Sequence, residues 1–204
     1  MVNNSNLRRR LQEITDEAAA SNVTPSELEQ MIADLASTHP HSIRCVGKEK
    51  SHRCFAHAFQ LTQSKTYRYI AYIDACSGRE VFFAGSEFAR FLTQSGKLQE
   101  ISQNETRPGD VVIYFDDDEM PEHAGRIVAD GKRIKSKWGG GGLLLEHRLY
   151  EVPESYGEVV RFYRTILTKE AEGAFLEFAK SREGFDEFVE LYELRDLFQK
   201  SDSQ

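Results

Sequence analysis

Three apolar runs that follow one another between residues 107 and 138 constrain the fold of this chain more than any other feature. The runs are VVIYF, HAGRIV and RIKSKW. The turn sequence RPGD leads into the first run, and the pair Asp130-Gly131, a strong hairpin signal, separates the last two. We therefore predict three consecutive antiparallel strands. The acidic loop from Asp116 to Glu119 is interpreted as a solvated hairpin tip, with a cation site as the alternative.

Helical patterns lie on both sides of these strands. Thr24 is a predicted N-cap, Pro25 occupies the first helical position, and Glu27 closes a capping box. We predict helical structure over residues 6–38, because apolar residues behind this cap recur on one helical face, namely Leu28, Met31, Ile32 and Leu35. A second helical region begins at Thr168, and we expect Gly184 to divide it into two helices.

The segments in between give a mixed α+β pattern. TYRYIAYID (66–74) is predicted to be a strand because it is rich in tyrosine and isoleucine. A helix is predicted from Ser86 to Gly96, and VVRFYR (159–164) reads as a final strand. The predicted organisation is an N-terminal helical region at 1–40, a central domain at 41–167, and an acidic helical pair at 168–204 that docks on it.

Charge and composition exclude several classes of function. The chain has 204 residues and a formal net charge of −7, which argues against broad binding to nucleic acid or to an anionic membrane. No apolar run follows the basic residues near the N-terminus, and no window is long enough to span a bilayer. We therefore expect a cytoplasmic protein with reduced thiols at Cys45, Cys54 and Cys76.

One of these cysteines has a sequence context suited to chemistry. Cys54 stands at the start of a short apolar segment, CFAHAF, that is predicted to be helical. The amides at a helix start favour a thiolate, so the pattern predicts a lowered pKa for Cys54. His123 begins the second strand of the central block. A thiol nucleophile needs a base within hydrogen-bond reach, and residues far apart in sequence can supply it. The sequence therefore predicts a Cys54–His123 pair.

The order of these motifs resembles the NlpC/P60 branch of the papain-like cysteine peptidases. The cysteine at a helix start, the strand RPGDVVIYF, the strand-initial histidine in HAGRIV and the turn DGKRI carry this resemblance. It spans about residues 50–167. A related papain-like pattern has SK-x-G after the histidine strand, followed by E-H and Y-G. These motifs stand here at residues 136–139, 146–147 and 156–157.

The resemblance implies an α+β fold in which a cysteine-bearing helix packs on an antiparallel sheet, with extra helices at both termini. It also implies that Cys54 is the nucleophile and His123 the base in attack on an amide, ester or thioester carbonyl of a peptide-like or acyl substrate. Ser136 is the candidate to orient His123, and His147 is the alternative. Cys76 is an alternative nucleophile, because Asp74-Ala75-Cys76-Ser77-Gly78 resembles the usual cysteine context of the branch.

Other interpretations remain open at this stage. His57, Trp138 and His147 are candidates for the substrate cleft, with the glycines 139–142 as a flexible lip. Cys45, His52, Cys54 and His57 are residue types that bind zinc, but their spacing matches no recognised zinc motif, and we predict neither a metal nor another cofactor. A papain-like fold that binds a partner without turnover is the second functional hypothesis.

Overall fold

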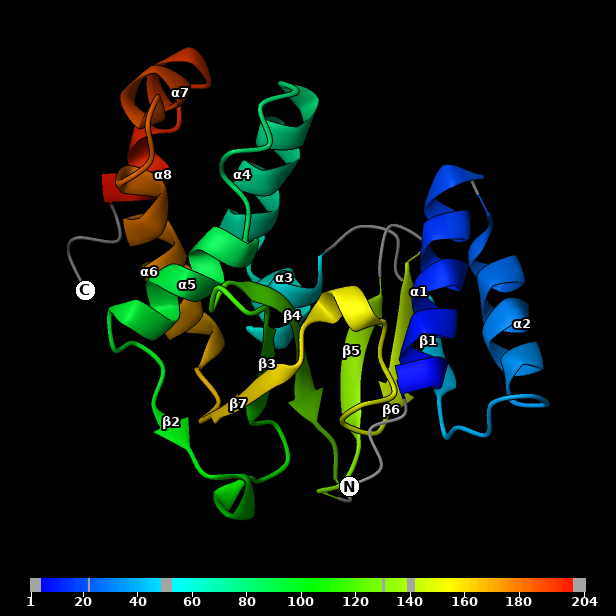
Figure 1. Cartoon of the computed structure of the whole chain (residues 1–204). Helices are drawn as coiled ribbons and strands as arrows, with labels where there is room; N and C mark the ends of the chain where they lie inside the picture. The colour runs from blue at the N-terminus through cyan, green and yellow to red at the C-terminus, as the bar shows by residue number, and fades with distance from the viewer. Residues whose placement is uncertain (1–4, 22, 49–52, 130, 139–141, 200–204) are drawn as a thin grey trace.

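The structure is a computed structural model that describes residues 5–21, 23–48, 53–129, 131–138 and 142–199. Figure 1 shows a central sheet with helices on both faces. The strands are β1 (Arg44–Lys48), β2 (Glu100–Ile101), β3 (Val111–Phe115), β4 (Pro121–Ile127), β5 (Ile134–Trp138), β6 (Leu143–His147) and β7 (Val159–Tyr163). The α-helices are α1 (Ser5–Ala20), α2 (Pro25–Leu35), α3 (Cys54–Ala58), α4 (Lys65–Cys76), α5 (Ser86–Gln94), α6 (Thr168–Lys180), α7 (Phe185–Leu191) and α8 (Arg195–Gln199). Short 3-10 turns are η1 (Leu61–Gln63), η2 (Gln103–Glu105) and η3 (Glu154–Tyr156).

The predicted strand block is confirmed. Strands β3, β4 and β5 pair in sequence order, and every strand pair of the sheet is antiparallel. The sheet order is β1-β6-β5-β4-β3-β7-β2, so β4 lies in the middle. Asp130 of the predicted hairpin turn lies outside the described residues, whereas Gly131 has the positive φ of 66° that such a turn requires. The α+β class with an antiparallel sheet is thus confirmed.

Most of the predicted helices are also present. Thr24 caps α2 and forms the predicted capping box with Glu27. Helix α5 begins at Ser86 as predicted. Gly184, with φ of 77°, separates α6 from α7, and the short helix α8 follows them. None of the helices among the described residues has the length and apolar character needed to cross a bilayer.

The predicted strand at TYRYIAYID is wrong, because these residues form α4. Ser64 caps this helix by accepting a hydrogen bond from the Tyr67 amide at 2.9 Å. Tyr67 and Ile70 lie three residues apart and are buried, whereas Tyr69 and Tyr72 are exposed. Burial therefore follows a helical period, and packing of one helical face overrides the strand propensity of the individual residues.

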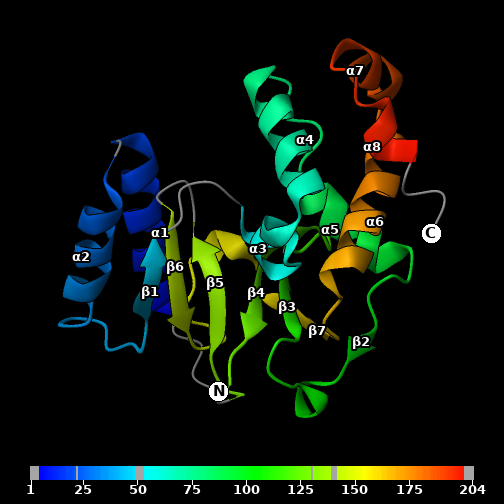
Figure 2. The same ribbon diagram turned by 180° about the vertical axis from the view of Figure 1, so that it is seen from behind.

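Two apolar cores lie on the two faces of the sheet. The α3-side core joins helices α3 to α8 to one face of the sheet and includes Phe59, Phe88, Phe175, Ile113 and Ala124. The α1-side core joins α1 and α2 to the other face and includes Leu7, Leu11, Leu28, Tyr114 and Trp138. Figures 1 and 2 show α1 and η3 over one face and α3 over the other. Helix α3 packs on β4 and β5, so the cysteine-bearing helix lies against the central strands.

Candidate functional site

Cys54 is the first residue of α3 and is half-buried. The backbone amides of Cys54 itself, Phe55 and Ala124 lie near its sulfur, and each of them lowers the pKa of the thiol. Ala124 belongs to β4 and directly follows His123. The fold therefore brings the predicted nucleophile to the predicted histidine strand, because α3 packs on β4.

The predicted lowered pKa of Cys54 is not found. Burial outweighs the three amides and raises the pKa of the thiol to about 11. Helix α3 has only five residues, so its dipole is too short to reverse the cost of placing a charged sulfur away from water. In this conformation the thiol is protonated at neutral pH.

A pocket of about 350 Å³ opens beside the thiol. Its wall includes the aromatic rings of Phe83 and Phe178, from the loop before α5 and from α6. The residues that line it are Arg53, Cys54, Phe55, Glu80, Val81, Phe83, Gly85, Ser86, Glu87, Glu122 and Phe178. Cys54 thus contributes to the wall of a cleft that holds both apolar and charged groups.

His123 points away from this pocket. It pairs directly with Tyr114 of β3, and opposed residues of an antiparallel pair project to the same face of the sheet. Tyr114 belongs to the α1-side core, whereas the neighbouring Ala124 belongs to the α3-side core with Cys54. The predicted direct contact between the thiol and the imidazole is therefore not made in this structure.

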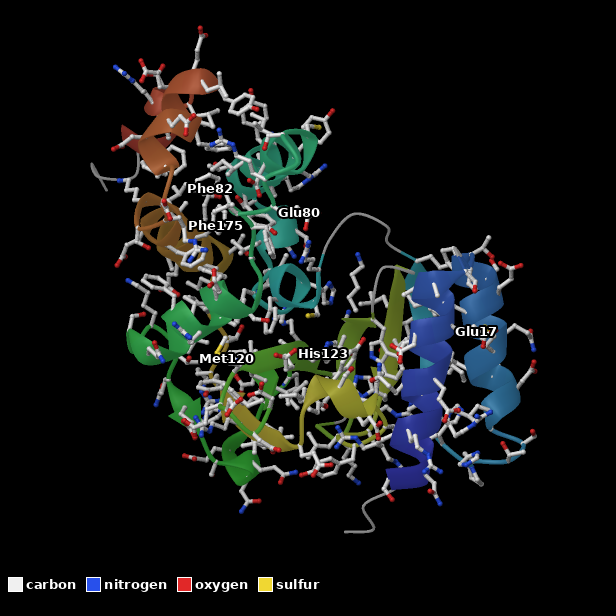
Figure 3. All side chains as sticks on the ribbon, turned by 45° about the horizontal axis from the view of Figure 1, so that its top comes forward. Glu17, Glu80, Phe82, Met120, His123 and Phe175 are labelled. Atoms are coloured by element: carbon white, nitrogen blue, oxygen red, sulfur yellow. The ribbon has the colours of Figure 1, made fainter. Side chains whose placement is uncertain are left out.

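The imidazole is held by an aromatic contact instead. It lies face to face on the ring of Tyr156, with ring centroids 3.9 Å apart and planes 17° apart. Figure 3 shows His123 beside the yellow segment that carries η3. Its Nε2 atom is buried and has no hydrogen-bond partner among the described residues. Burial lowers the pKa of His123 well below its usual range, with a smaller contribution from the nearby His147.

Ser136 does not orient His123. Its hydroxyl lies 2.7 Å from Nε2 of His147 and accepts a hydrogen bond from the Trp138 indole at 3.0 Å. The other ring nitrogen of His147, Nδ1, lies 2.8 Å from the backbone oxygen of Arg148. Because that carbonyl can only accept, Nδ1 carries the proton, and the Ser136 hydroxyl then donates to the bare Nε2 of the neutral ring. The Ser136 hydroxyl is thereby committed to His147 and Trp138.

The cleft residues predicted from the sequence do not line the pocket beside Cys54. Trp138 and His147 are fully buried in the sheet on the α1 side, and His57 is not among the residues that line the pocket. Strand alternation directs Trp138 and His147 to the face of the sheet opposite Cys54. The glycine lip at 139–141 lies outside the described residues.

The other two thiols do not lie at the start of a helix. Cys76 is the last residue of α4 and is exposed. Cys45 lies in β1. No group of three His, Cys, Asp or Glu residues in the part of the chain that the structure describes could hold a metal ion. His52, one of the four residues considered for zinc, lies outside that part. Cys54 is thus the one cysteine of the three that begins a helix.

Three further residues near the candidate site were not predicted from the sequence, namely Glu122, Arg53 and Arg8. Glu122 and Arg53 directly precede His123 and Cys54, so their positions next to the two candidate residues were the available signal. Arg8 is buried beneath η3, where its guanidinium donates hydrogen bonds to the backbone oxygens of Pro153, Glu154 and Gly157. No sequence signal indicated that an arginine of the N-terminal helix would support the segment that carries Tyr156.

Comparisons with known proteins extend these observations in one respect. No curated protein and no solved structure matches the chain. One protein family does match, over residues 46–164, and its description is "Domain of unknown function (DUF7689)". The matched segment runs from β1 to the end of β7 and includes Cys54, His123 and Ser136, but neither the N-terminal nor the C-terminal helices. Because the match covers more than half of the chain, this protein belongs to the DUF7689 family.

Proposed function

We propose that this protein is a papain-like cysteine hydrolase or acyltransferase in which Cys54 is the nucleophile and His123 the base. The observation that carries the proposal is the position of Cys54 at the start of α3, where this helix packs on β4 and Cys54 lines an open pocket, with backbone amides close to its sulfur. Amide donors held in this way stabilise negative charge that develops during acyl transfer. The resemblance of the motifs to NlpC/P60-type enzymes supports the same assignment.

The proposed reaction proceeds through an acyl-enzyme. The thiol proton passes to His123 while the sulfur forms a bond to the substrate carbonyl carbon, and the amide of Cys54 donates to the oxygen that becomes negative. The bond from carbon to the leaving group then breaks, and His123 returns the proton to that group. Water, or an amine acceptor, attacks the thioester in the same way and restores the thiol.

This assignment requires a change in the position of His123. The imidazole must leave Tyr156 and reach the thiol, which lies next to the backbone of Ala124. Because His123 projects from the face of β4 opposite Cys54, this movement requires a one-residue change in the register of β4 and not only a rotation of the side chain. We therefore assign the stacked position of His123 to the resting state.

A second candidate function is binding without turnover. The protonated thiol, the stacked imidazole and the commitment of Ser136 to His147 favour it. In this case the pocket beside Cys54 would hold a ligand or a peptide segment of a partner, and His123 would serve only to fill the core.

The two candidates differ in acylation at Cys54. The folded chain is incubated with p-nitrophenyl esters and short acyl thioesters, and the acyl adduct is located by peptide mass spectrometry. We expect an adduct at Cys54 that is lost in Cys54→Ala, and an acylation rate at least about 100-fold lower in His123→Gln. Cys76→Ala and His39→Gln are matched controls and should retain the parent rate.

Two outcomes of the acylation experiment would contradict the enzyme proposal. If Cys54 is not acylated in the folded chain, or is acylated at the same rate in His123→Gln, then no thiol–imidazole pair operates. Circular dichroism of each variant verifies that it is folded. The binding function would then be the better description.

A further inference from the structure

The pocket beside Cys54 contains three glutamates and one arginine among its lining residues. These are Arg53, Glu80, Glu87 and Glu122. A charged pocket can recognise an ion of opposite sign only where one of its charges is not already neutralised by a neighbour. The partners of each of these groups therefore decide what the pocket can bind.

Two of the glutamates each form an ion pair with an arginine. Glu80 forms an ion pair with Arg53 at 2.6 Å, and the Arg53 guanidinium also lies 4.0 Å above the ring of Phe83. Glu87 forms an ion pair with Arg182 at 2.6 Å. Both arginines are thus engaged by a carboxylate, and these two pairs are balanced in charge.

Arg182 also lies 5.4 Å above the second aromatic wall of the pocket, Phe178. Each arginine therefore contacts one carboxylate and one ring, so a protein cation already lies against Phe83 and another against Phe178. A substrate cation would have to find its partner elsewhere in the pocket.

Glu122 is that remaining carboxylate. It has no ion-pair or hydrogen-bond partner among the residues that the structure describes. Its position follows from a β-bulge: Phe115 pairs with Pro121 and Tyr114 with His123, so Glu122 is the extra residue of β4. Glu122 is exposed at the pocket, but neighbouring groups displace part of the water around its carboxyl, and this effect and the nearby Asp116 raise its pKa, because both disfavour the charged form. A cation next to Glu122 would offset both effects.

We propose that Glu122 is a specificity-determining residue that selects substrates with a positively charged group next to the bond attacked by Cys54. A lysine or arginine side chain of a peptide, or the ammonium group of an amine acceptor, has this chemistry. The inference rests on the proposed function for its meaning as substrate selection. The underlying claim, a negative pocket at the Cys54 thiol created by Glu122, can be measured without turnover.

Charged thiol reagents of equal reach test this claim. The folded chain is treated with the cationic 2-(trimethylammonio)ethyl methanethiosulfonate or with the anionic 2-sulfonatoethyl analogue, and modification of each cysteine is followed by peptide mass spectrometry. The ratio of cationic to anionic rates removes any effect of the thiol pKa, since both reagents react with the same thiolate. Cys76, which is exposed, provides an internal reference.

We expect a higher ratio at Cys54 than at Cys76, and a ratio about two- to five-fold lower at Cys54 in Glu122→Gln, as for an exposed ion pair. Raising the salt concentration should reduce the difference. Glu17→Gln removes the same charge from exposed α1, far from Glu80 in Figure 3, and should leave the ratio unchanged.

Three results would overturn the inference. These are equal ratios at Cys54 and Cys76, an equal fall of the ratio in Glu17→Gln and Glu122→Gln, and a Cys54 that neither reagent modifies in the folded chain. Failure of the proposed enzyme activity gives a different pattern, in which Glu122→Gln changes the reagent ratio but no acyl-enzyme forms at Cys54. The two proposals can therefore fail separately.

Discussion

The imidazole of His123 lies parallel to the phenol ring of Tyr156 at a centroid distance of 3.9 Å, and this stack links the candidate base to the N-terminal helix. Tyr156 is the last residue of η3, and the backbone of η3 is held by the guanidinium of Arg8 in α1. A residue outside the family-matched segment therefore supports the position of His123.

Removing the ring of Tyr156 should change the titration of His123. In Tyr156→Leu, water gains access to the imidazole, so the pKa of His123 should rise from its depressed position toward the usual range near 6.5. Tyr156→Phe retains the ring and should preserve the depressed pKa. The measurement is an NMR pH titration of the His123 ring proton Hε1. Identical curves for the parent and Tyr156→Leu would show that the stack does not shield the imidazole.

Arg8 should be important for stability even though it is an arginine on a terminal helix. It is 2% exposed, and its guanidinium donates to the Gly157 oxygen at 2.7 Å. Arg8→Met leaves buried carbonyl groups without a donor and should lower the free energy of unfolding by about 2 kcal/mol or more. Arg9→Met, at the exposed neighbouring position, should change it by less than about 0.5 kcal/mol. Urea denaturation monitored by circular dichroism gives both free energies of unfolding. Equal losses in Arg8→Met and Arg9→Met would contradict a stabilising role for the hydrogen bonds of Arg8.

Acid should destabilise the protein through His147. Burial lowers its pKa to about 4, so between pH 6.5 and 4 the unfolded chain binds a proton that the folded chain excludes. The free energy of unfolding should therefore fall by about 1.4 kcal/mol per pH unit in this window, or about 3 kcal/mol in total from this residue. His123 contributes in the same direction.

The control for this pH effect is a variant that cannot titrate. His147→Gln should show a shallower dependence of unfolding free energy on pH between 6.5 and 4 than the parent, whereas His39→Gln, in the loop after α2, should follow the parent. Urea denaturation at pH 7.5, 6, 5 and 4.5 provides the comparison. Parallel curves for the parent and His147→Gln would assign the acid sensitivity to other groups.

Two glycines should respond to alanine with opposite signs. Gly157 has φ of 96°, and a Cβ there would lie 2.2 Å from the Phe115 backbone oxygen. Gly157→Ala should therefore lower the free energy of unfolding by about 3 kcal/mol or more. Gly173 lies within α6, and no atom lies within 4 Å of a Cβ added there. Gly173→Ala should therefore raise the free energy of unfolding by about 0.5–1 kcal/mol. Thermal unfolding should separate the two variants by several degrees. A stabilised Gly157→Ala would contradict the close contact between η3 and β3.

Local signals in the sequence were sufficient for much of the fold. The capping box of Thr24 and Glu27, the start of α5 at Ser86 and the break at Gly184 each depend on residues within a few positions of one another. The antiparallel order of β3, β4 and β5 follows from alternating apolar runs and short connections. These features could be predicted because they depend on interactions between residues within one helical turn or one hairpin.

The secondary structure of α4 could not be predicted from local sequence signals. Its tyrosines and isoleucines favour a strand when taken one by one, but the helix buries Tyr67, Ile70 and Asp74 on one face against the α3-side core. Strand propensity is a preference for a half-buried surface and depends on what packs against it. Only the tertiary structure supplies that surface.

The site shows the same division between local sequence and tertiary context. The sequence indicated Cys54 and His123 as candidates, and the fold packs the cysteine helix on the histidine strand. The direction of His123, however, depends on the register that pairs it with Tyr114, next to a bulge at Glu122. A slip of one residue would turn the imidazole to the face of Cys54, since side chains alternate along a strand. The sequence thus determined which residues meet in the middle of the sheet, while the tertiary register decided that Glu122 faces the pocket and His123 faces Tyr156.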